Sequence, residues 1–258
     1  GVPPDLMFLQ NLPSIVVTYV LDPKRGEMVL DLCASPGGKT THIAQRMLDS
    51  GLVVAFDKSE QKVLEIRKNA SMLGLKSICA FKVDAIKSRQ YLAEDSTYRK
   101  LDVDATFAAR EKGFACPSLR PGQFDRVLVD PSCSALGIRP RLNAGELRPE
   151  DLQRYPRLQR ALVRAGTRLL KVGGTLVFST CTISPLENEA NVVAMLEEFP
   201  LRLEPIPAEL VRRFDSGLPS IDRLPPSFPS SCLRFDPSST RYDTPGFFCA
   251  RFIKTSGQ

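Results

Sequence analysis

The chain has 258 residues, of which 43% are hydrophobic and 25% charged, with a formal net charge of +6 and a pI of about 9.0. That length suits one large α/β domain, and no apolar run approaches the ~18 residues of a membrane span, so no membrane partner is expected. One histidine and seven cysteines without a C-x-x-C pair argue against the usual zinc site and against a Ser-His-Asp triad. Such cysteine usage fits a cytoplasmic protein, with the nucleus as the alternative, and the basic charge favours a polyanionic partner.

The N-terminal part predicts a lead-in over 1–25, with a short helix at 15–21, followed by a strand, a small-residue loop and a helix. The strand spans 28–33, the loop 34–38 and the helix 39–48. Small loop side chains let a ligand approach the backbone N–H groups, where the helix N-terminus favours an anion. The loop is neither G-x-G-x-x-G nor a phosphate loop, and an ordinary βα turn remains the alternative.

Two further strands also end in an acid. The strand 53–57 ends at Asp57, about 20 residues after the glycine turn, where a carboxylate can accept both ribose hydroxyls of an adenosine. A helix is expected over 60–73. The next strand, 77–83, precedes Asp84, which either contacts an adenine edge or caps a turn. These acids lie at the carboxyl edge, where open α/β sheets bind ligands.

The segment 85–123 shows no clean period and is interpreted as an insert. A strand over 124–130 follows and leads into Cys133. The loop 131–150 and the helix 151–170 are rich in basic residues, which form a stripe at steps of three and four on the helix. The stripe is either a solvated helix face or a rim for phosphates, for which the loop arginines are the better candidates. The basic residues are Arg139, Arg141, Arg148, Arg154, Arg157, Arg160, Arg164, Arg168 and Lys171.

A fifth strand is expected over 175–181, after Gly173-Gly174 ends the preceding helix, and it carries Cys181 at its end. Ser184-Pro185-Leu186-Glu187 predicts the start of a helix that runs to about 199, whose dipole could favour a thiolate at Cys181. If the fourth and fifth strands are neighbours, Cys133 and Cys181 could reach one planar substrate. Two buried core cysteines are the alternative.

The C-terminal part is expected to be a proline-rich loop region with short strands over 203–245, with a candidate strand at 201–206, and a final aromatic strand at 246–253. Alternating strands and helices predict a mostly parallel α/β sheet.

Four motifs in order resemble those of the Sun/NSUN family of RNA cytosine-5 methyltransferases, also named RsmB/NOP. They are Asp31-Leu32-Cys33-Ala34-Ser35-Pro36-Gly37-Gly38-Lys39-Thr40, Asp130-Pro131-Ser132-Cys133-Ser134, Ser179-Thr180-Cys181-Thr182 with Glu187-Asn188-Glu189, and Gly246-Phe247-Phe248. The likeness spans nearly the whole chain. Segments 8–14 and 40–44, with Arg139-Pro140, are most similar to the branch that holds the sixth human member and its plant relatives.

The resemblance implies a Rossmann-like class I S-adenosylmethionine-dependent methyltransferase with a seven-stranded, mostly parallel sheet and helices on both faces. It implies a single catalytic domain over 1–258, and we expect that the family's N-terminal RNA-binding region and PUA domain are absent from this chain. The expected partner is RNA, with tRNA near the 3′ end of its acceptor stem as the main target and some mRNA. We expect a monomer without a metal.

The resemblance also implies a mechanism. Cytosine C5 is a poor nucleophile, and addition of a thiolate at C6 activates it; a free cysteine is only a few per cent thiolate at neutral pH. Cys181 is implied as the nucleophile, and Cys133 as the group that assists loss of the C5 proton or otherwise releases the enzyme. Asp130 would hydrogen-bond the base at N3 and the exocyclic amine. Lys39 would lie close to cofactor and base. DNA cytosine methyltransferases suggest the opposite roles for the two cysteines.

By the same resemblance, the cofactor residues are a loop, three acids and two lysines. They are Cys33, Ala34, Ser35, Pro36, Gly37, Gly38, Lys39, Asp57, Lys62, Asp84 and Asp130. Ser132 and Ser35 depart from the more usual Pro and Ala, but neither change removes a reacting group. Three alternatives remain: the same chemistry on rRNA or mRNA, a catalytically weak RNA-binding relative, and an NAD-dependent dehydrogenase, which would not explain the paired cysteines.

Overall fold

The computed structural model of the chain describes its helices and strands over most of the length. The described residues are 7–87, 113, 116, 119–138, 148–215 and 223–257. The strands are β1 (Met28–Asp31), β2 (Leu52–Asp57), β3 (Ile78–Lys82), β4 (Phe124–Val129), β5 (Leu170–Thr180), β6 (Leu201–Leu203), β7 (Cys232–Phe235) and β8 (Phe247–Lys254). The helices are α1 (Leu12–Leu21), α2 (Gly38–Arg46), α3 (Glu60–Met72), α5 (Pro149–Leu169), α6 (Glu189–Glu198), α7 (Ala208–Arg213) and α8 (Phe228–Ser231).

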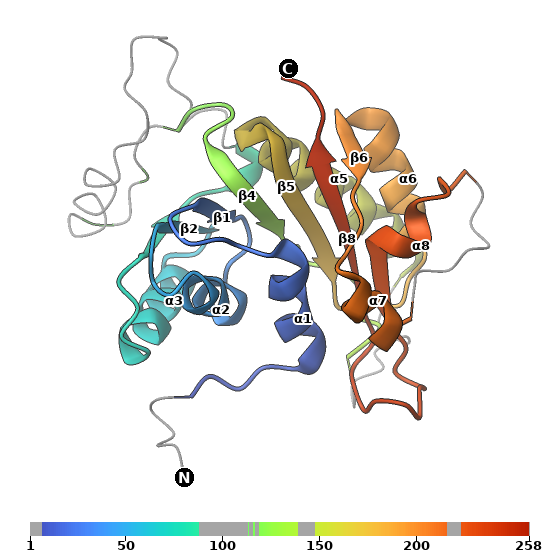
Figure 1. The fold of residues 1–258 in the computed structure, drawn as a ribbon, viewed down its shortest axis with the longest axis horizontal. Helices are drawn as coiled ribbons and strands as arrows, with labels where there is room; N and C mark the ends of the chain where they lie inside the picture. The colour runs from blue at the N-terminus through green and yellow to red at the C-terminus, as the bar shows by residue number, and fades with distance from the viewer. Residues whose placement is uncertain are drawn as a thin grey trace.

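The strands form one mixed sheet in the order β3-β2-β1-β4-β5-β8-β6 (Figure 1). Strands β1 to β5 are parallel, and β8 runs antiparallel to β5. On its other side, β8 pairs with β6 near the C-terminus and with β7 near its start. The predicted Rossmann-like fold is confirmed. Within the described residues the sheet has eight strands, one more than the seven expected, and the additional strand β7 lies in the region where a loop with short strands was predicted.

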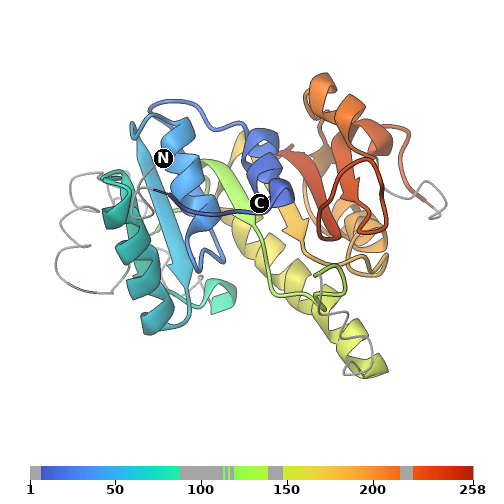
Figure 2. The same cartoon turned by 90° about the horizontal axis from the view of Figure 1, so that it is seen from below.

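Each face of the sheet has its own hydrophobic core, because successive strand side chains point to opposite sides. On β1, Leu30 faces the core that includes Leu162 of α5 and Met195 of α6. Its neighbour Val29 faces the core formed with Val17 of α1 and other residues of α1, α2 and α3. Figure 1 shows α1, α2 and α3 on the near face of the sheet, and Figure 2 shows α5 extending from the opposite face. This sandwich explains the continuous apolar runs of the parallel strands.

The strand order places a topological switch point at β1. From β1 the chain moves outward to β2 and β3 on one side, and later to β4 and β5 on the other. Open α/β sheets bind ligands at the carboxyl ends of strands beside such a point. Asp31 ends β1 and Asp57 ends β2, while Asp130 follows β4 and Cys181 follows β5. The fold therefore gathers the predicted site residues along one edge.

Some predicted boundaries differ. Helix α5 ends at Leu169, and Gly173 and Gly174 lie inside the irregular first part of β5. This part is irregular because the register with β4 shifts between Phe124 and Arg126, and Gly173 has φ +77°, a conformation that suits glycine.

Helix α6 begins at Glu189, whereas the predicted start was the Ser184-Pro185 pair. Residues 185–188 form turns in which Asn188 accepts a hydrogen bond from Thr180. The N-terminus of α6 is therefore farther along the chain from Cys181 than predicted, which weakens the expectation that its dipole favours a thiolate there.

Two parts of the predictions fall largely outside the described residues. These are most of the insert 85–123 and the loop arginines Arg139 and Arg141. No helix among the residues that the structure describes is both long and apolar enough to cross a membrane.

Candidate active site

The two cysteines meet at the carboxyl edge of the sheet. Strands β4 and β5 are parallel neighbours, so the expectation that they adjoin is confirmed. Cys133 and Cys181 come from the loops that follow these strands, and their sulfur atoms lie 3.2 Å apart. Both side chains are only partly buried, which is consistent with access by a substrate. The predicted pair is therefore a contact between two thiols, and not two separate core cysteines.

The surroundings make the two thiols unequal. The hydrogen bond from the Cys133 thiol is the main cause that lowers the pKa of Cys181, although burial opposes it. The Lys39 ammonium also lowers the pKa of Cys181. As the donor in the same bond, Cys133 has a raised pKa, to which burial adds. Cys181 is therefore the thiol that ionises first.

An ion pair lies next to the cysteines. Lys39 Nζ is 2.7 Å from Asp130 Oδ2, and the Ser179 hydroxyl donates a 2.6 Å hydrogen bond to the other Asp130 oxygen. Burial alone would lower the pKa of Lys39, but Asp130 outweighs it and the net shift is upward. Lys39 also lies 5.5 Å from the centre of the Phe247 ring, a cation–π distance. The charges of both groups are thus held in place before any ligand arrives.

A hollow of about 330 Å³ opens beside this pair, between the ends of β1 to β4 and helix α5. One carboxylate oxygen of Asp57 accepts a 3.0 Å hydrogen bond from the Ser59 backbone N–H, and the other oxygen is 4.0 Å from Lys62 Nζ. The lining residues are Leu32, Cys33, Ser35, Asp57, Lys58, Lys62, Val83, Asp84, Ala85, Ile86, Asp130, Pro131, Ser132, Leu158 and Leu162. An apolar wall on one side and acids on the other suit a nucleoside.

A smaller hollow of about 190 Å³ adjoins the first and shares Cys33, Ser35 and Asp130 with it. The small-residue loop 34–38 lines one side of this hollow, and the segment before α1 lines the other. The lining residues are Phe8, Leu9, Gln10, Asn11, Ser14, Asp31, Cys33, Ala34, Ser35, Pro36, Gly38, Lys39 and Asp130. A Cβ on Gly38 would collide with the Gln10 and Phe8 side chains, so glycine permits this close approach.

The predicted cofactor residues all lie in these two hollows except Gly37. Gly37 is the residue before α2 and has φ +103°, so it shapes the turn into the helix. The adjoining hollows fit the predicted S-adenosylmethionine, because acids line the larger one and the loop lines the smaller one. Asp31 adds a buried carboxylate oxygen that has no hydrogen-bond partner among the described residues, a feature that suits a cationic ligand group.

Sequence reasoning assigned no role to several lining residues. Leu158 and Leu162 were expected only in the apolar face of α5, and they line the nucleoside-sized hollow. The helical spacing of apolar residues is the same for side chains in the core and for side chains in a pocket wall, so the sequence could not distinguish these two positions. Phe247 belongs to a motif that was recognised, but its position under Lys39 depends on the pairing of β8 with β5.

The basic helix stripe divides into two groups. Arg160 and Arg164 pair with Glu198 of α6, at 2.8 and 3.5 Å, so this part is a structural helix–helix contact. Arg154 and Arg157 are exposed and line a hollow of about 480 Å³ that shares Leu158 with the nucleoside-sized hollow. The part of the stripe nearest the site therefore remains available to phosphates.

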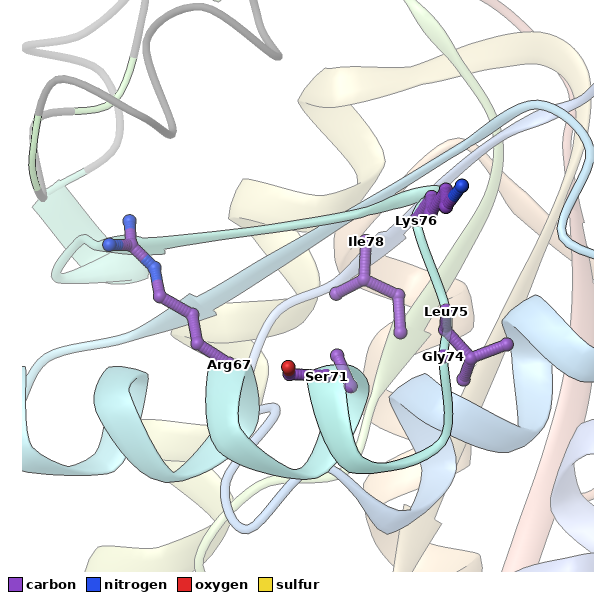
Figure 3. Close-up of a pocket in the computed structure, with 7 residues that line it drawn as sticks. Arg67, Ser71, Gly74, Leu75, Lys76 and Ile78 are labelled. Atoms are coloured by element: carbon purple, nitrogen blue, oxygen red, sulfur yellow. The ribbon is translucent and has the colours of Figure 1, made fainter. Parts of the chain in front are cut away.

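A further hollow of about 450 Å³ lies between α3 and the start of β3 (Figure 3). Its described lining is Arg67, Ala70, Ser71, Gly74, Leu75, Lys76 and Ile78, which includes no cysteine and no carboxylate. Arg67 also donates to the Ala80 and Gly113 carbonyl oxygens. This hollow lies at the amino-terminal end of β3, away from the cysteines. Among the described residues, no group of three or more potential metal ligands comes together.

Comparison with known sequences gives consistent matches. The model of the family described as 16S rRNA methyltransferase RsmB/F matches residues 18–253. A human protein described as tRNA (cytosine(72)-C(5))-methyltransferase NSUN6 is 40% identical, over 97% of this chain and 54% of its own length. An Arabidopsis thaliana protein described as rRNA (cytosine-C(5))-methyltransferase NOP2C is 34% identical, over 95% of this chain and 53% of its own length. The chain spans about half the length of these relatives.

Solved structures agree with this result. The crystal structure of NSun6 from Pyrococcus horikoshii with SFG is 32% identical, with a TM-score of 0.72, and the match covers 96% of this chain and 53% of that chain. A methyltransferase homolog protein from Pyrococcus horikoshii is 28% identical, with a TM-score of 0.71, over 96% of this chain and 68% of that chain.

Proposed function

The chain belongs to the RsmB/F family, which includes the NSUN RNA cytosine-5 methyltransferases, and from this membership we propose that it forms 5-methylcytosine in RNA with S-adenosylmethionine as methyl donor. The observation that carries the proposal is the 3.2 Å contact between Cys133 and Cys181 beside the Lys39–Asp130 ion pair. One lowered and one raised thiol pKa within a single contact match the two tasks of this reaction.

In the proposed mechanism, the Cys181 thiolate adds to C6 of the cytosine, which places an electron pair at C5. The bound cofactor supplies the methyl group. Asp130 hydrogen-bonds N3 and the exocyclic amine, and Lys39 holds that carboxylate in place. Loss of the C5 proton, assisted by Cys133, restores the C5–C6 double bond and expels the Cys181 thiolate.

We propose that different parts of the cofactor occupy the two hollows. Asp57 would accept the ribose hydroxyls, and Asp84 would lie beside the adenine, both in the larger hollow. The loop from Cys33 to Lys39 would hold the methionine part in the smaller hollow. The structure of a relative with SFG, an S-adenosylmethionine analogue, supports S-adenosylmethionine as the cofactor.

We propose tRNA as the substrate, because the human relative is described as a tRNA methyltransferase. The target base must leave its stack before it can reach the cysteines, which costs a few kcal/mol and least at a frayed end. Arg154 and Arg157 would hold nearby phosphates. We further propose a monomer that acts in the cytoplasm, with the nucleus as the alternative.

Covalent trapping tests the proposal. With cofactor and tRNA, Cys133→Ala is expected to accumulate a protein–RNA adduct that survives denaturant, because addition at C6 proceeds while release fails. Cys181→Ala should form none. Cys249→Ala, a buried cysteine on β8, is the control and should behave like the unaltered protein. Adducts with Cys181→Ala but none with Cys133→Ala would reverse the two roles. Absence of adduct and methylation in every variant would refute the activity.

The plant relative, described as an rRNA methyltransferase, supports a second candidate substrate. Parallel methylation assays with tRNA and with rRNA, read by bisulfite sequencing, distinguish the two. A faster initial rate on rRNA would overturn the tRNA assignment and leave the chemistry unchanged.

A further inference from the structure

Glu187 is a fully buried carboxylate in the segment that follows Cys181, and the proposed reaction gives it no role. It accepts hydrogen bonds from the Ser134 backbone N–H at 3.1 Å, from the Ser134 hydroxyl, and from Gln159 Nε2 at 2.8 Å. Buried carboxylates are costly unless such donors surround them. One side chain therefore links helix α5, the Cys133 loop and the Cys181 segment.

The contacts of Glu187 hold the Cys133 loop on both sides of the cysteine. Ser134, the next residue, donates two of the three hydrogen bonds. Ser132, the preceding residue, accepts a 3.3 Å hydrogen bond from the same Gln159 amide that binds Glu187. The backbone around the Cys133 sulfur is thus attached at two points to one carboxylate and its partner.

The next residue, Asn188, holds the Cys181 loop in the same way. Its Oδ1 accepts a 2.6 Å hydrogen bond from Thr180, and its Nδ2 donates at 3.0 Å to the Thr182 carbonyl oxygen. Thr180 and Thr182 flank Cys181. The Ser134 and Thr182 hydroxyls are 2.7 Å apart, which joins the two loops directly. Two consecutive residues therefore each hold one cysteine loop.

We infer that Glu187 is a positioning residue that sets the contact between the Cys133 and Cys181 sulfur atoms. The role deepens the proposed function, because both thiols must act on the same base. Removing the carboxylate would release Ser134 and let the Cys133 loop move away from Cys181. The hydrogen bond that makes Cys181 the more acidic thiol would then weaken.

The hydrogen bonds of the Glu187 side chain can be separated experimentally from its negative charge. A glutamine at 187 can turn its oxygen toward the Ser134 N–H and Gln159 and donate its amide to the Ser134 hydroxyl. That hydroxyl then donates to Thr182, so every bond survives and only the two bonds of the Ser134 hydroxyl reverse direction. Glu187→Gln should therefore keep the geometry, whereas Glu187→Ala cannot.

The test follows alkylation of Cys181 by iodoacetamide against pH, with the modified cysteine identified by mass spectrometry. It needs no RNA, so it stands even if the proposed activity fails. For Glu187→Ala we expect the midpoint for Cys181 to rise by about one pH unit, which lowers its rate near neutrality about tenfold. Glu187→Gln should stay within about threefold of the unaltered protein.

The matched control is Glu189→Ala. Glu189 is equally buried two residues away, but its carboxylate pairs with Arg234 of β7. It should lower thermal stability without moving the alkylation midpoint. If Glu187→Ala fails to fold, Ser134→Ala removes the hydroxyl bonds to Glu187 and Thr182 with less disturbance and should shift the midpoint the same way.

Three results would overturn the inference: an unchanged midpoint in folded Glu187→Ala, the same shift in Glu189→Ala, or, with Glu187→Ala unfolded, an unchanged midpoint in Ser134→Ala. An adduct assay separates the two proposals. If the unaltered protein does not methylate RNA but the variants show the expected alkylation midpoints for Cys181, the result counts against the proposed function and not against the role of Glu187.

Discussion

Asp31 shows how a single side chain can oppose folding at the site. Burial is the main cause that raises its pKa to about 6, and the hydrogen bond from Thr40 only partly compensates. One of its oxygens is buried without a hydrogen-bond partner next to the smaller hollow. A carboxylate kept in such a place weakens the fold at neutral pH and keeps a negative charge ready for a ligand.

The pH dependence of stability follows from this shift. An unfolded Asp has a pKa of about 3.9, so between about pH 4 and 6 the unfolded chain loses this proton first and stability falls as pH rises. Asp31→Asn should remove this slope. The variant should be up to about 3 kcal/mol more stable at pH 7 and unchanged near pH 4, measured by urea unfolding.

Asp49 supplies a control of opposite sign. Burial opposes its ionisation, but hydrogen bonds from Ser77 and Lys76 outweigh burial and lower its pKa. Its stabilisation is present above the unfolded pKa and is lost as pH falls through the folded value, so Asp49→Asn should destabilise the protein at pH 7. If the free energy of unfolding falls with pH equally steeply in the unaltered protein and in Asp31→Asn, the buried charge of Asp31 does not explain the pH dependence.

At the scale of elements, α5 connects β4 to β5 and also serves the site. Its C-terminal half attaches to α6 through Arg160 and Arg164, which share Glu198. Its N-terminal half presents Arg154 and Arg157 near the pocket. One basic stripe thus has a structural end and an end that is open to RNA.

Arg154→Gln combined with Arg157→Gln should weaken RNA binding several-fold at low salt. Two lost phosphate contacts should also reduce the slope of log affinity against log salt by about 1.4 for single-stranded RNA. Filter binding at several salt concentrations measures both quantities. Arg164→Gln, whose arginine pairs with Glu198, should leave the slope unchanged. If Arg164→Gln changes the slope by half as much as the double variant, the stripe acts only through net charge, because the double variant removes twice as many charges.

The parallel half of the sheet could be predicted from sequence because each strand is a buried apolar run closed by an acid or a small-residue turn. The position of β7 could not be predicted within the region of short strands, because its four residues depend on pairing with β8. Cys133, Cys181 and Asp130 stood out as motifs at strand ends. Glu187 was visible in a motif, but its bonds to Ser134 and Gln159 join residues 53 and 28 positions away.

At the scale of the whole molecule, ligand binding should raise global stability. The two adjoining hollows draw residues from the lead-in, the strand ends of β1 to β4 and α5, so a cofactor there contacts elements from both faces of the sheet. A ligand that binds only the folded state stabilises it by about 2.7 kcal/mol at one hundred times its dissociation constant.

Saturating S-adenosylhomocysteine should therefore raise the melting temperature by about 5–10 °C, while NAD should not. Differential scanning fluorimetry measures the shift. Asp57→Asn should lose most of it, because the ribose hydroxyls lose their charged acceptor. Asp236→Asn, at an exposed carboxylate after β7, should keep the full shift. A larger shift with NAD than with S-adenosylhomocysteine would favour a dehydrogenase.

The 3.2 Å separation of the two sulfur atoms also determines how the site responds to peroxide. Attack of the Cys181 thiolate on hydrogen peroxide forms a sulfenic acid and releases hydroxide. The adjacent Cys133 thiol can then displace water from that sulfenic acid and form a disulfide. This condensation competes with further oxidation to sulfinic acid, which thiol reductants do not reverse. The arrangement that prepares a nucleophile thus also protects it, because mild reduction can restore the pair.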